Sequence, residues 1–235
     1  MLEIVLPPAK LAPLDQFSGS LGQRVYQTLR QAILSLSYKP GEILRKPEIC
    51  QQLGVSRSPV SDAVARLAAE GLVDVVPQAG TYVARFSMVE IREGAFLREA
   101  IELQAIELVA ETITEDQLVQ LRRNITVQAA LLADGDTAGF HQLDGEMHEL
   151  IRNFTGYRKL SSVADTAWAH VNRARQLLLP IEGRGQATLE EHRAILSALE
   201  AHDPTAARKA LRYHLRQLIS YLEPLERSHP EYFNP

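Results

Sequence analysis

Apolar residues near the start of the chain recur every three or four positions, which is the spacing of a helix with one buried face. They are Leu21, Val25, Leu29, Ile33 and Leu36. Turn-forming residues at 39–41 end this first helix. A second helix over 47–53 begins with a proline, which suits the first helical turn, and Gly54 ends it. The pattern therefore predicts a pair of short helices.

A third amphipathic helix is predicted from Ser58 to Glu70. Its buried face consists of Val60, Val64 and Leu67. Ser56 or Ser58 caps its beginning, Pro59 lies near its first position, and Gly71 ends it. Three short helices, the last two separated by a tight turn, are typical of a helix-turn-helix.

Two short strands follow the third helix. Residues 72–76 and 82–84 are rich in β-branched and aromatic residues, and the turn-forming stretch 77–80 lies between them. A two-strand hairpin in this place is the wing of a winged helix-turn-helix. Because such folds insert a helix into the major groove, the pattern makes DNA the first partner to consider.

Beyond Phe86 the pattern changes to long helices with few strand signals. We predict six of them, over 88–110, 114–134, 136–154, 158–179, 188–202 and 204–226. Thr188 and Glu191 form a capping box for the fifth helix, and Asp203 caps the sixth, which begins with Pro204. The predicted fold class is mostly α, with an N-terminal winged helix-turn-helix followed by an all-α helical bundle.

Composition excludes several classes of protein. The chain has 235 residues, of which 46% are hydrophobic, enough for packed cores. No apolar run approaches the roughly 20 residues that span a bilayer, and the first residues lack the pattern of a signal peptide. Cys50 is the single cysteine, which excludes an internal disulfide framework. We expect a cytoplasmic protein with no membrane partner.

Charge is unevenly distributed, although the net charge is only −4. Residues 1–86 contain 9 Lys and Arg against 7 Asp and Glu, whereas residues 87–235 contain 16 against 22. A mildly basic front and an acidic back suit a DNA-binding head on a sensor or dimerisation body. Many two-domain enzymes show a similar difference, so charge alone does not separate these classes.

Side chains at the start of the third helix are the candidates for contacts to DNA bases. They are Ser56, Arg57, Ser58 and Ser61. Arg57 has the donors for a two-point contact to guanine, and the serine hydroxyls suit phosphates or bases. Arg45 and Lys46, before the second helix, are placed for phosphate contacts, or they are solvated surface charges. Gly80 leaves room for the wing to approach the minor groove.

The segment from Leu21 to Arg85 resembles the DNA-binding head of GntR-family bacterial regulators. The matching residues, in the family's order and spacing, are Pro40-Gly41-Glu42, Leu53-Gly54-Val55-Ser56-Arg57, Pro59-Val60, Leu67, Glu70-Gly71-Leu72 and Gly80-Thr81-Tyr82-Val83. Family members usually carry an operator-reading arginine after the Pro-Val pair, where this chain has Ser61 followed by Asp62. The resemblance implies DNA binding, with an operator that differs from the family's common half-site.

A second group of residues has the chemistry of a metal site. Asp144 and His148 are four positions apart, so on a helix they share one face. His192 and His214 lie on two later predicted helices. Three imidazoles and one carboxylate suit Zn²⁺, with Ni²⁺ or Mn²⁺ as alternatives. Spacing alone leaves the assignment open, because the chain has 7 histidines and His141 shares the face of the first pair.

Residues 88–226 resemble the FCD domain, the all-helical effector domain of the FadR subfamily of GntR regulators. The residues that carry the resemblance are Leu97-Arg98-Glu99-Ala100-Ile101-Glu102, Asp144, His148, Glu191-His192, Ile195 and His214. In metal-binding members one Asp and three His occupy the four corresponding places, so the resemblance implies that these four residues bind the metal. Six helices rather than seven imply the shorter, VanR-like form.

The same resemblance implies an effector pocket beside the metal. The planar guanidinium of Arg98 suits a bound carboxylate, and Asn172 is a second candidate for this pocket. The alternative for Arg98 is a salt bridge to Glu102, four residues further on. Trp168 shares the face of Asn172, and core packing is the simpler role for its ring.

These observations predict four parts and one function. The parts are a flexible arm over 1–20, a DNA-binding domain over 21–86, an all-helical metal-binding, ligand-binding and dimerisation domain over 87–228, and a tail over 229–235. The predicted function is that of a homodimeric transcriptional regulator, a repressor that a small organic acid releases from a palindromic operator.

Two alternatives use the same residues. A mononuclear metal-dependent hydrolase with a winged-helix appendage is conceivable because three His and one Asp can activate water, but no general base or nucleophile motif accompanies them. A purely structural metal that stabilises the bundle is the other. We expect a regulator rather than an enzyme.

Overall fold

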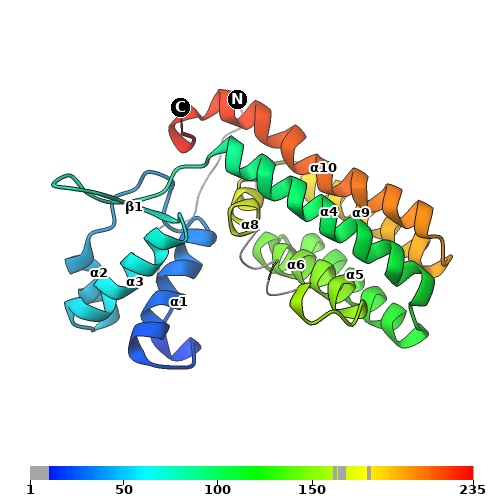
Figure 1. Cartoon of the computed structure of the whole chain (residues 1–235), viewed down its shortest axis with the longest axis horizontal. Helices are drawn as coiled ribbons and strands as arrows, with labels where there is room; N and C mark the ends of the chain where they lie inside the picture. Colours follow the sequence, from blue (N-terminus) through cyan, green and yellow to red (C-terminus); the bar gives the residue numbers. More distant parts are fainter. Residues whose placement is uncertain (1–10, 161–162, 164–167, 179–180, 235) are drawn as a thin grey trace. The chain divides into compact units, whose positions relative to one another are not determined.

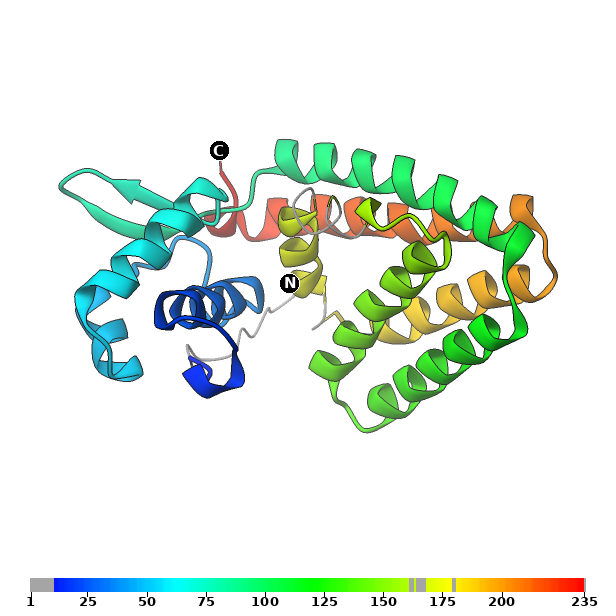
Figure 2. The ribbon, with the colours of Figure 1, turned by 60° about the horizontal axis from the view of Figure 1, so that its bottom comes forward.

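A computed structural model describes residues 11–160, 163, 168–178 and 181–234. These residues form two compact units, one of residues 11–88 with 225–234 and the other within 89–224. The first unit contains a β-hairpin, and the described part of the second is built from helices (Figures 1 and 2). Each unit has its own hydrophobic core.

The N-terminal unit consists of helices followed by a two-strand hairpin, as predicted. Its elements are the 3₁₀ turn η1 (Leu14–Gln16), α1 (Leu21–Leu34), α2 (Lys46–Leu53), α3 (Arg57–Ala69), β1 (Val73–Val76), β2 (Gly80–Val83) and, at the end of the chain, η3 (Pro230–Tyr232). α3 packs against both α1 and α2. Most of the apolar residues that predicted these helices form the core between them, together with Ile49 of α2, whereas Leu21 is exposed. The predicted residues in the core are Val25, Leu29, Ile33, Val60, Val64 and Leu67. The winged helix-turn-helix is therefore confirmed.

The helix ends of this unit differ in detail from the expectation. Gly54 has a φ of 65° and ends α2 in the left-handed region that glycine tolerates. Leu36 has a φ of 58°, so α1 ends at Leu34 rather than two residues later. Ser56 precedes α3, but its side chain accepts no hydrogen bond from the helix, and Ser58 lies inside it. Ser56 therefore occupies the expected N-cap position, but without the side-chain hydrogen bond of a serine cap.

The hairpin is antiparallel, and its strands are shifted slightly from the predicted positions. Val73 lies opposite Val83, and Val76 lies opposite Gly80, so the second strand begins two residues earlier than expected. The turn is formed by 77–79, where Gln78 has a φ of 63°. In Figure 1 the hairpin projects beyond the three helices of its unit.

The last residues of the chain pack on this N-terminal unit, although the sequence suggested only a tail over 229–235. Phe233 forms a parallel bridge with Phe86. The backbone N–H of Phe86 donates to Tyr232 O at 2.8 Å, and the N–H of Asn234 donates to Phe86 O at 2.7 Å. The two phenylalanine rings, with centroids 5.6 Å apart, are buried. Residues distant in sequence thus complete the unit.

The second unit consists of long helices, which confirms the mostly α fold class. Its elements are α4 (Met88–Thr112), α5 (Glu115–Ala133), α6 (Thr137–Phe154), α8 (Ala169–Arg175), the 3₁₀ turn η2 (Gln176–Leu178), α9 (Arg184–Glu200) and α10 (Pro204–Ser228). α5 packs against α6 and α9. α4 and α10 run side by side in both views (Figures 1 and 2), and Glu107 on α4 pairs with Arg208 on α10 at 2.6 Å. None of the helices in the described part of the chain is long and apolar enough to cross a membrane.

Two predicted helices of this unit need correction or qualification. α9 begins at Arg184, four residues before Thr188, so Thr188 and Glu191 form no capping box. Instead the Thr188 hydroxyl donates to Arg184 O at 3.0 Å inside the helix. The predicted helix over 158–179 lies partly outside the described residues, and its described part is interrupted by a turn at Trp168. In contrast, Asp203 Oδ1 accepts the N–H of Ala206 at 2.9 Å and begins α10, as expected.

Candidate functional site

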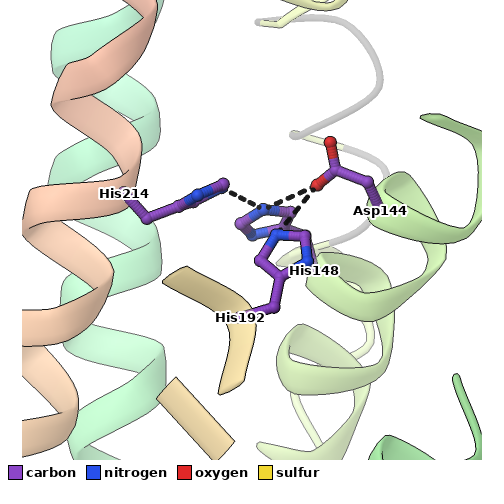
Figure 3. Close-up of side chains that lie close together, drawn as sticks. All are labelled: Asp144, His148, His192 and His214. Atoms are coloured by element: carbon purple, nitrogen blue, oxygen red, sulfur yellow. Dashed lines mark hydrogen bonds and ion pairs between the residues drawn. The ribbon is translucent and has the colours of Figure 1, made fainter. Parts of the chain in front are cut away.

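The four candidate metal ligands come together inside the second unit (Figure 3). Asp144 and His148 lie one turn apart on α6, His192 lies on α9 and His214 lies on α10. One ligand atom from each lies within 4.8 Å of those of the other three, and all four residues are buried. The spacing on one helix predicted the first pair, and the packing of three helices brings the other two imidazoles to it.

Each of these imidazoles has a buried acceptor on its Nδ1 side. His192 forms a hydrogen bond with Gln128 at 2.8 Å, and His214 forms one with Glu191 at 2.7 Å. Nδ1 of His148 lies 2.7 Å from Oε2 of Glu102, a close polar contact without hydrogen-bond geometry. An acceptor at Nδ1 favours the neutral tautomer that carries its proton there, which leaves a free lone pair on Nε2. Metal-binding histidines in proteins are oriented by the same kind of contact.

The Nε2 atoms face one another and the Asp144 carboxylate. Nε2 of His148 lies 3.0 Å from Nε2 of His214 and 3.4 Å from Oδ1 of Asp144, and Nε2 of His192 lies 3.3 Å from the same oxygen. Asp144 Oδ1 and His192 Nε2 are buried without a hydrogen-bond partner among the described residues. Facing lone pairs repel unless a cation or proton lies between them. Since ligands of Zn²⁺ lie about 2.0–2.2 Å from the ion, these separations suit a shared divalent cation.

Burial keeps the three imidazoles uncharged. It lowers the pKa of His192 and of His214 well below their ordinary value of 6.5, and it also lowers the pKa of His148. Burial alone would raise the pKa of Glu102, but the positive charge of Arg98 and its other neighbours lowers it overall. The site therefore offers neutral imidazoles at pH 7, the form in which histidine binds a metal ion, beside the ionised carboxylate of Glu102.

A cavity of about 400 Å³ opens beside this cluster and is lined by Asp144 and His214 among others. Its apolar lining consists of Leu132, Phe140, Leu178, Ile181, Leu215 and Leu218. Its basic lining consists of Arg98, Arg175 and Arg184. A concave apolar wall with a few guanidinium groups suits a small organic anion.

Each of the three arginines has a carboxylate partner. The pairs are Arg98 with Glu102 at 3.0 Å, Arg175 with Asp144, and Arg184 with Glu191 at 2.6 and 2.9 Å. Sequence analysis missed Arg175 and Arg184, because neither belongs to a recognisable motif and their partners are set by packing. Glu102, Gln128 and Glu191 were also missed as partners of the histidines, for the same reason.

Of the two residues expected to bind the effector, one lines the cavity and the other is not among its lining residues. Arg98 lines the cavity, and it also forms the salt bridge to Glu102 that was the alternative for it. Asn172 is exposed on α8 and is not among the residues described as lining the cavity. Trp168 is buried, with the guanidinium carbon of Arg152 lying 4.8 Å from its ring centroid.

The candidate DNA-contacting residues of α3 lie at its exposed beginning. Ser56, Arg57 and Ser58 are exposed, and Ser61, one turn further on, is half-buried. Asp62 is exposed beside it. A base-contacting role at this helix end would therefore fall mainly on Arg57, which has the only basic side chain among these five residues.

The other candidates for DNA contact lie around α2 and the wing. Arg45 is exposed just before α2 and pairs with Glu48 at 3.4 Å, and Lys46 is the first residue of that helix. Gly80 lies in β2 opposite Val76, so the turn at 77–79 forms the end of the wing. Gly80 has a φ of 146°, which favours glycine at that position.

Comparison with known proteins identifies relatives of both units. The profile described as "Bacterial regulatory proteins, gntR family" matches residues 21–83, and the FCD domain matches residues 93–217. An HTH-type transcriptional regulator from an unstable DNA locus of Streptomyces ambofaciens is 32% identical over 219 residues, covering 93% of this chain and 92% of the relative. The HTH-type transcriptional repressor RspR of Escherichia coli is 29% identical over 214 residues, covering 91% and 94%.

Solved structures show the same fold. E. coli McbR/YncC is 24% identical with a TM-score of 0.74, covering 88% of this chain and 99% of that one. A putative GntR regulator from Rhodococcus is 22% identical with a TM-score of 0.72, covering 86% and 99%. The hydrolase alternative finds no support among these proteins. The chain therefore belongs to the GntR family of bacterial DNA-binding transcriptional regulators, with an FCD domain in its C-terminal part, and it is a regulator rather than an enzyme.

Proposed function

We propose that this regulator is a metal-containing repressor that a small carboxylate releases from its operator. It acts in the cytoplasm as a homodimer on a palindromic DNA site. The observation that carries the proposal is the cavity beside the cluster of Asp144 and three histidines, where metal-binding donors and guanidinium groups border one space. The relative RspR is named a transcriptional repressor, which supports repression as the direction of control.

The metal would be held by Asp144, His148, His192 and His214. Their donor set of three imidazole nitrogens and one carboxylate oxygen favours Zn²⁺, with Ni²⁺ or Mn²⁺ as alternatives. A bound ion would supply positive charge next to the cavity. Hydrogen bonds at Nδ1 of His192 and His214 favour the orientation and tautomer that this role needs, and Glu102 lies close to Nδ1 of His148.

The effector would be a small carboxylate with an uncharged remainder. Arg98 and the other two guanidinium groups of the cavity provide the positive potential, and the apolar wall provides a surface for the remainder. An effector changes operator affinity only as far as it binds one state of the protein better than another. The coupling therefore depends on how the cavity changes when the carboxylate enters.

Exposed apolar residues on α4 support the homodimer. Val89, Phe96 and Leu97 are 64%, 73% and 46% exposed. Phe96 and Leu97 follow Val89 by seven and eight positions, about two helical turns, so the three residues lie on the same side of the helix. Covering this face with the same face of a second copy would remove apolar surface from water. Two heads related by a two-fold axis then match a palindromic operator.

We assign the base contact to Arg57, with the hydroxyls of Ser56, Ser58 and Ser61 near it. Arg45 and Lys46 would contact the DNA backbone, and the wing around Gly80 would approach the minor groove. Ser61 and Asp62 stand where family members carry an arginine. An acidic side chain next to the groove disfavours the usual guanine contact there. We therefore expect an operator that differs from the common half-site of the family.

Band-shift binding to the DNA upstream of the gene tests the proposal. The metal-loaded full-length protein should bind this DNA, and a small carboxylate should weaken the binding. No DNA binding at moderate salt would refute the regulatory function. Operator binding and carboxylate response that persist unchanged after chelation would refute the metal-linked part, and a metal that affects only thermal stability would mean a structural role.

A further inference from the structure

Three guanidinium groups line the effector cavity, but their partners differ in kind. Arg184 donates to both oxygens of Glu191, and Arg98 donates through Nε to Glu102. These two carboxylates lie on the Nδ1 sides of histidines and are outside the candidate metal-binding set. Arg175 alone among the three is paired with a candidate metal ligand, the carboxylate of Asp144.

The two oxygens of Asp144 divide its interactions. Oδ2 accepts from the Arg175 guanidinium, whereas Oδ1 faces Nε2 of His148 and of His192. When the four donors hold a divalent cation, the negative charge of Asp144 is shared with that cation. Its attraction for Arg175 is then weaker. The carboxylates that pair with Arg98 and Arg184 lie outside the candidate metal-binding set, although Arg98 shares Glu102 with Arg152.

The charge balance around the cluster points in the same direction. Four arginine side chains, none more than 11% exposed, face three carboxylates that are at most 7% exposed. They are Arg98, Arg152, Arg175 and Arg184 with Glu102, Asp144 and Glu191. A divalent cation adds positive charge to this buried set, and added buried charge is costly unless an opposite charge accompanies it. The loaded site thus favours an anion at the guanidinium whose carboxylate partner is drawn to the metal, that of Arg175.

We infer that Arg175 receives the carboxylate of the effector, exchanging its contact with Asp144 for the ligand. This rests on the proposed function, and it moves the main anion contact from Arg98 to Arg175. The guanidinium of Arg175 already lines the cavity, so it needs no large movement to reach a ligand there. Its planar fork suits a two-point contact with a carboxylate.

His141 provides a second contact from the same side of the cavity. It lies one turn before Asp144 on α6 and lines the cavity. Its Nδ1 lies 2.9 Å from Nε2 of Gln176, whose amide donates to it, so the neutral ring carries its proton on Nε2. That Nε2 is buried and has no protein partner among the described residues. It is therefore a donor available to a ligand oxygen.

Ligand capture by Arg175 would act on α8. Arg175 is the last residue of this short helix and Gln176 follows it, while Trp168 precedes its first residue. Trp168 is the single tryptophan of the chain and is buried. Its fluorescence therefore reports on the segment that carries the proposed receptor.

The test compares carboxylate binding by Zn²⁺-loaded full-length variants. Succinate and benzoate are titrated, with succinamide and benzamide as uncharged counterparts, and binding is followed by Trp168 fluorescence and calorimetry. The variants are Arg175→Gln, Arg175→Lys, Arg98→Lys and Arg193→Gln. Arg193 is an exposed arginine of α9 that pairs with Glu190, so it controls for loss of one positive charge. Zn²⁺ affinity is measured separately for each variant without any acid.

We expect a carboxylate, and not its amide, to bind the wild type and Arg193→Gln equally. Arg175→Gln should weaken this binding about 10- to 100-fold, the range for loss of a charge-assisted hydrogen bond, and Arg175→Lys should weaken it less. Zn²⁺ affinity should stay equal or rise in Arg175→Gln, because Asp144 loses a competing partner. A merely structural role for Arg175 would instead lower both affinities.

Unchanged carboxylate affinity in Arg175→Gln would overturn the inference, as would a larger loss in Arg98→Lys than in Arg175→Gln. If neither acid binds the Zn²⁺-loaded wild type, the inference fails. Operator binding in the band shift then decides the regulatory function independently, because that assay needs no effector.

Discussion

Replacing Glu191 with glutamine tests whether the buried carboxylates organise the metal cluster. Glu191 accepts two hydrogen bonds from Arg184, at 2.6 and 2.9 Å, and lies 2.7 Å from Nδ1 of His214. Its side chain and that of Arg184 are 6% and 9% exposed. The glutamine amide has the shape of the glutamate carboxylate but no charge. Its NH₂ group replaces an oxygen that now accepts a hydrogen bond from Arg184 or His214. Either Arg184 or His214 then loses its acceptor.

The magnitude follows from the burial of the pair. Breaking a buried ion pair by removing one partner costs about 3–5 kcal/mol, and glutamine keeps one acceptor oxygen, so we expect about 3 kcal/mol. Loss of the acceptor on a metal-binding histidine lowers metal affinity about 10- to 100-fold. Urea unfolding of the metal-free protein measures the first effect, and calorimetric titration with Zn²⁺ measures the second.

The neighbouring Glu190→Gln is the matched control. Glu190 lies on the same helix, its side chain is 57% exposed, and it pairs with Arg193 at 2.6 Å. An exposed ion pair contributes less than about 1 kcal/mol, so this change should leave both measurements nearly unaltered. If Glu191→Gln behaved like Glu190→Gln in both assays, the reasoning about buried partners of the histidines would be refuted.

Three further predictions concern the rest of the molecule. Arg57→Ala should weaken specific operator binding by about 1–3 kcal/mol in band-shift titrations, and a negligible change would place the base reading elsewhere. Phe233→Ala should destabilise the N-terminal unit by about 3 kcal/mol in urea unfolding, because it removes the buried Phe233 ring that packs on Phe86. Equal stability of the variant and the wild type would contradict this prediction. Burial lowers the pKa of His192 and His214 in the folded protein, so the unfolded chain binds more protons below about pH 6.5. The free energy of unfolding of the metal-free protein should therefore be highest above that pH and fall on acidification, by up to about 1.4 kcal/mol per pH unit for each histidine. Urea unfolding at about pH 7 and about pH 5.5 with a chelator present measures this change. A free energy of unfolding that rises on acidification would show that the predicted sign is wrong.

The departure from the family at the reading helix bears on the choice of operator. Ser61 and Asp62 follow the Pro-Val pair on α3, and Asp62 is exposed. Its charge opposes approach to phosphate oxygens and guanine acceptors, whereas it suits the amino group of cytosine. The first operator variants to compare should therefore differ at the base pairs next to the contact proposed for Arg57.

The sequence determined the head almost completely, because its signals are local. Apolar spacing sets which face of each short helix is buried, and Gly54 ends α2 by a backbone property of its own. Local spacing also predicted that Asp144 and His148 lie together, since residues four positions apart on a helix share a face. The errors are local as well. The capping-box pattern placed the start of α9 at Thr188, whereas the helix begins at Arg184, after Gly183 with its φ of 75°.

The tertiary structure decided which groups meet across large separations in sequence. His148 and His214 are 66 positions apart, and Arg175 and Asp144 are 31 apart. Phe233 reaches Phe86 from the other end of the chain. No periodicity encodes such contacts, because they depend on how helix faces pack and on which buried charges must be compensated. For that reason the sequence could supply the candidate metal ligands, whereas the acceptors that orient them and the arginine beside them emerged only from the packed helices.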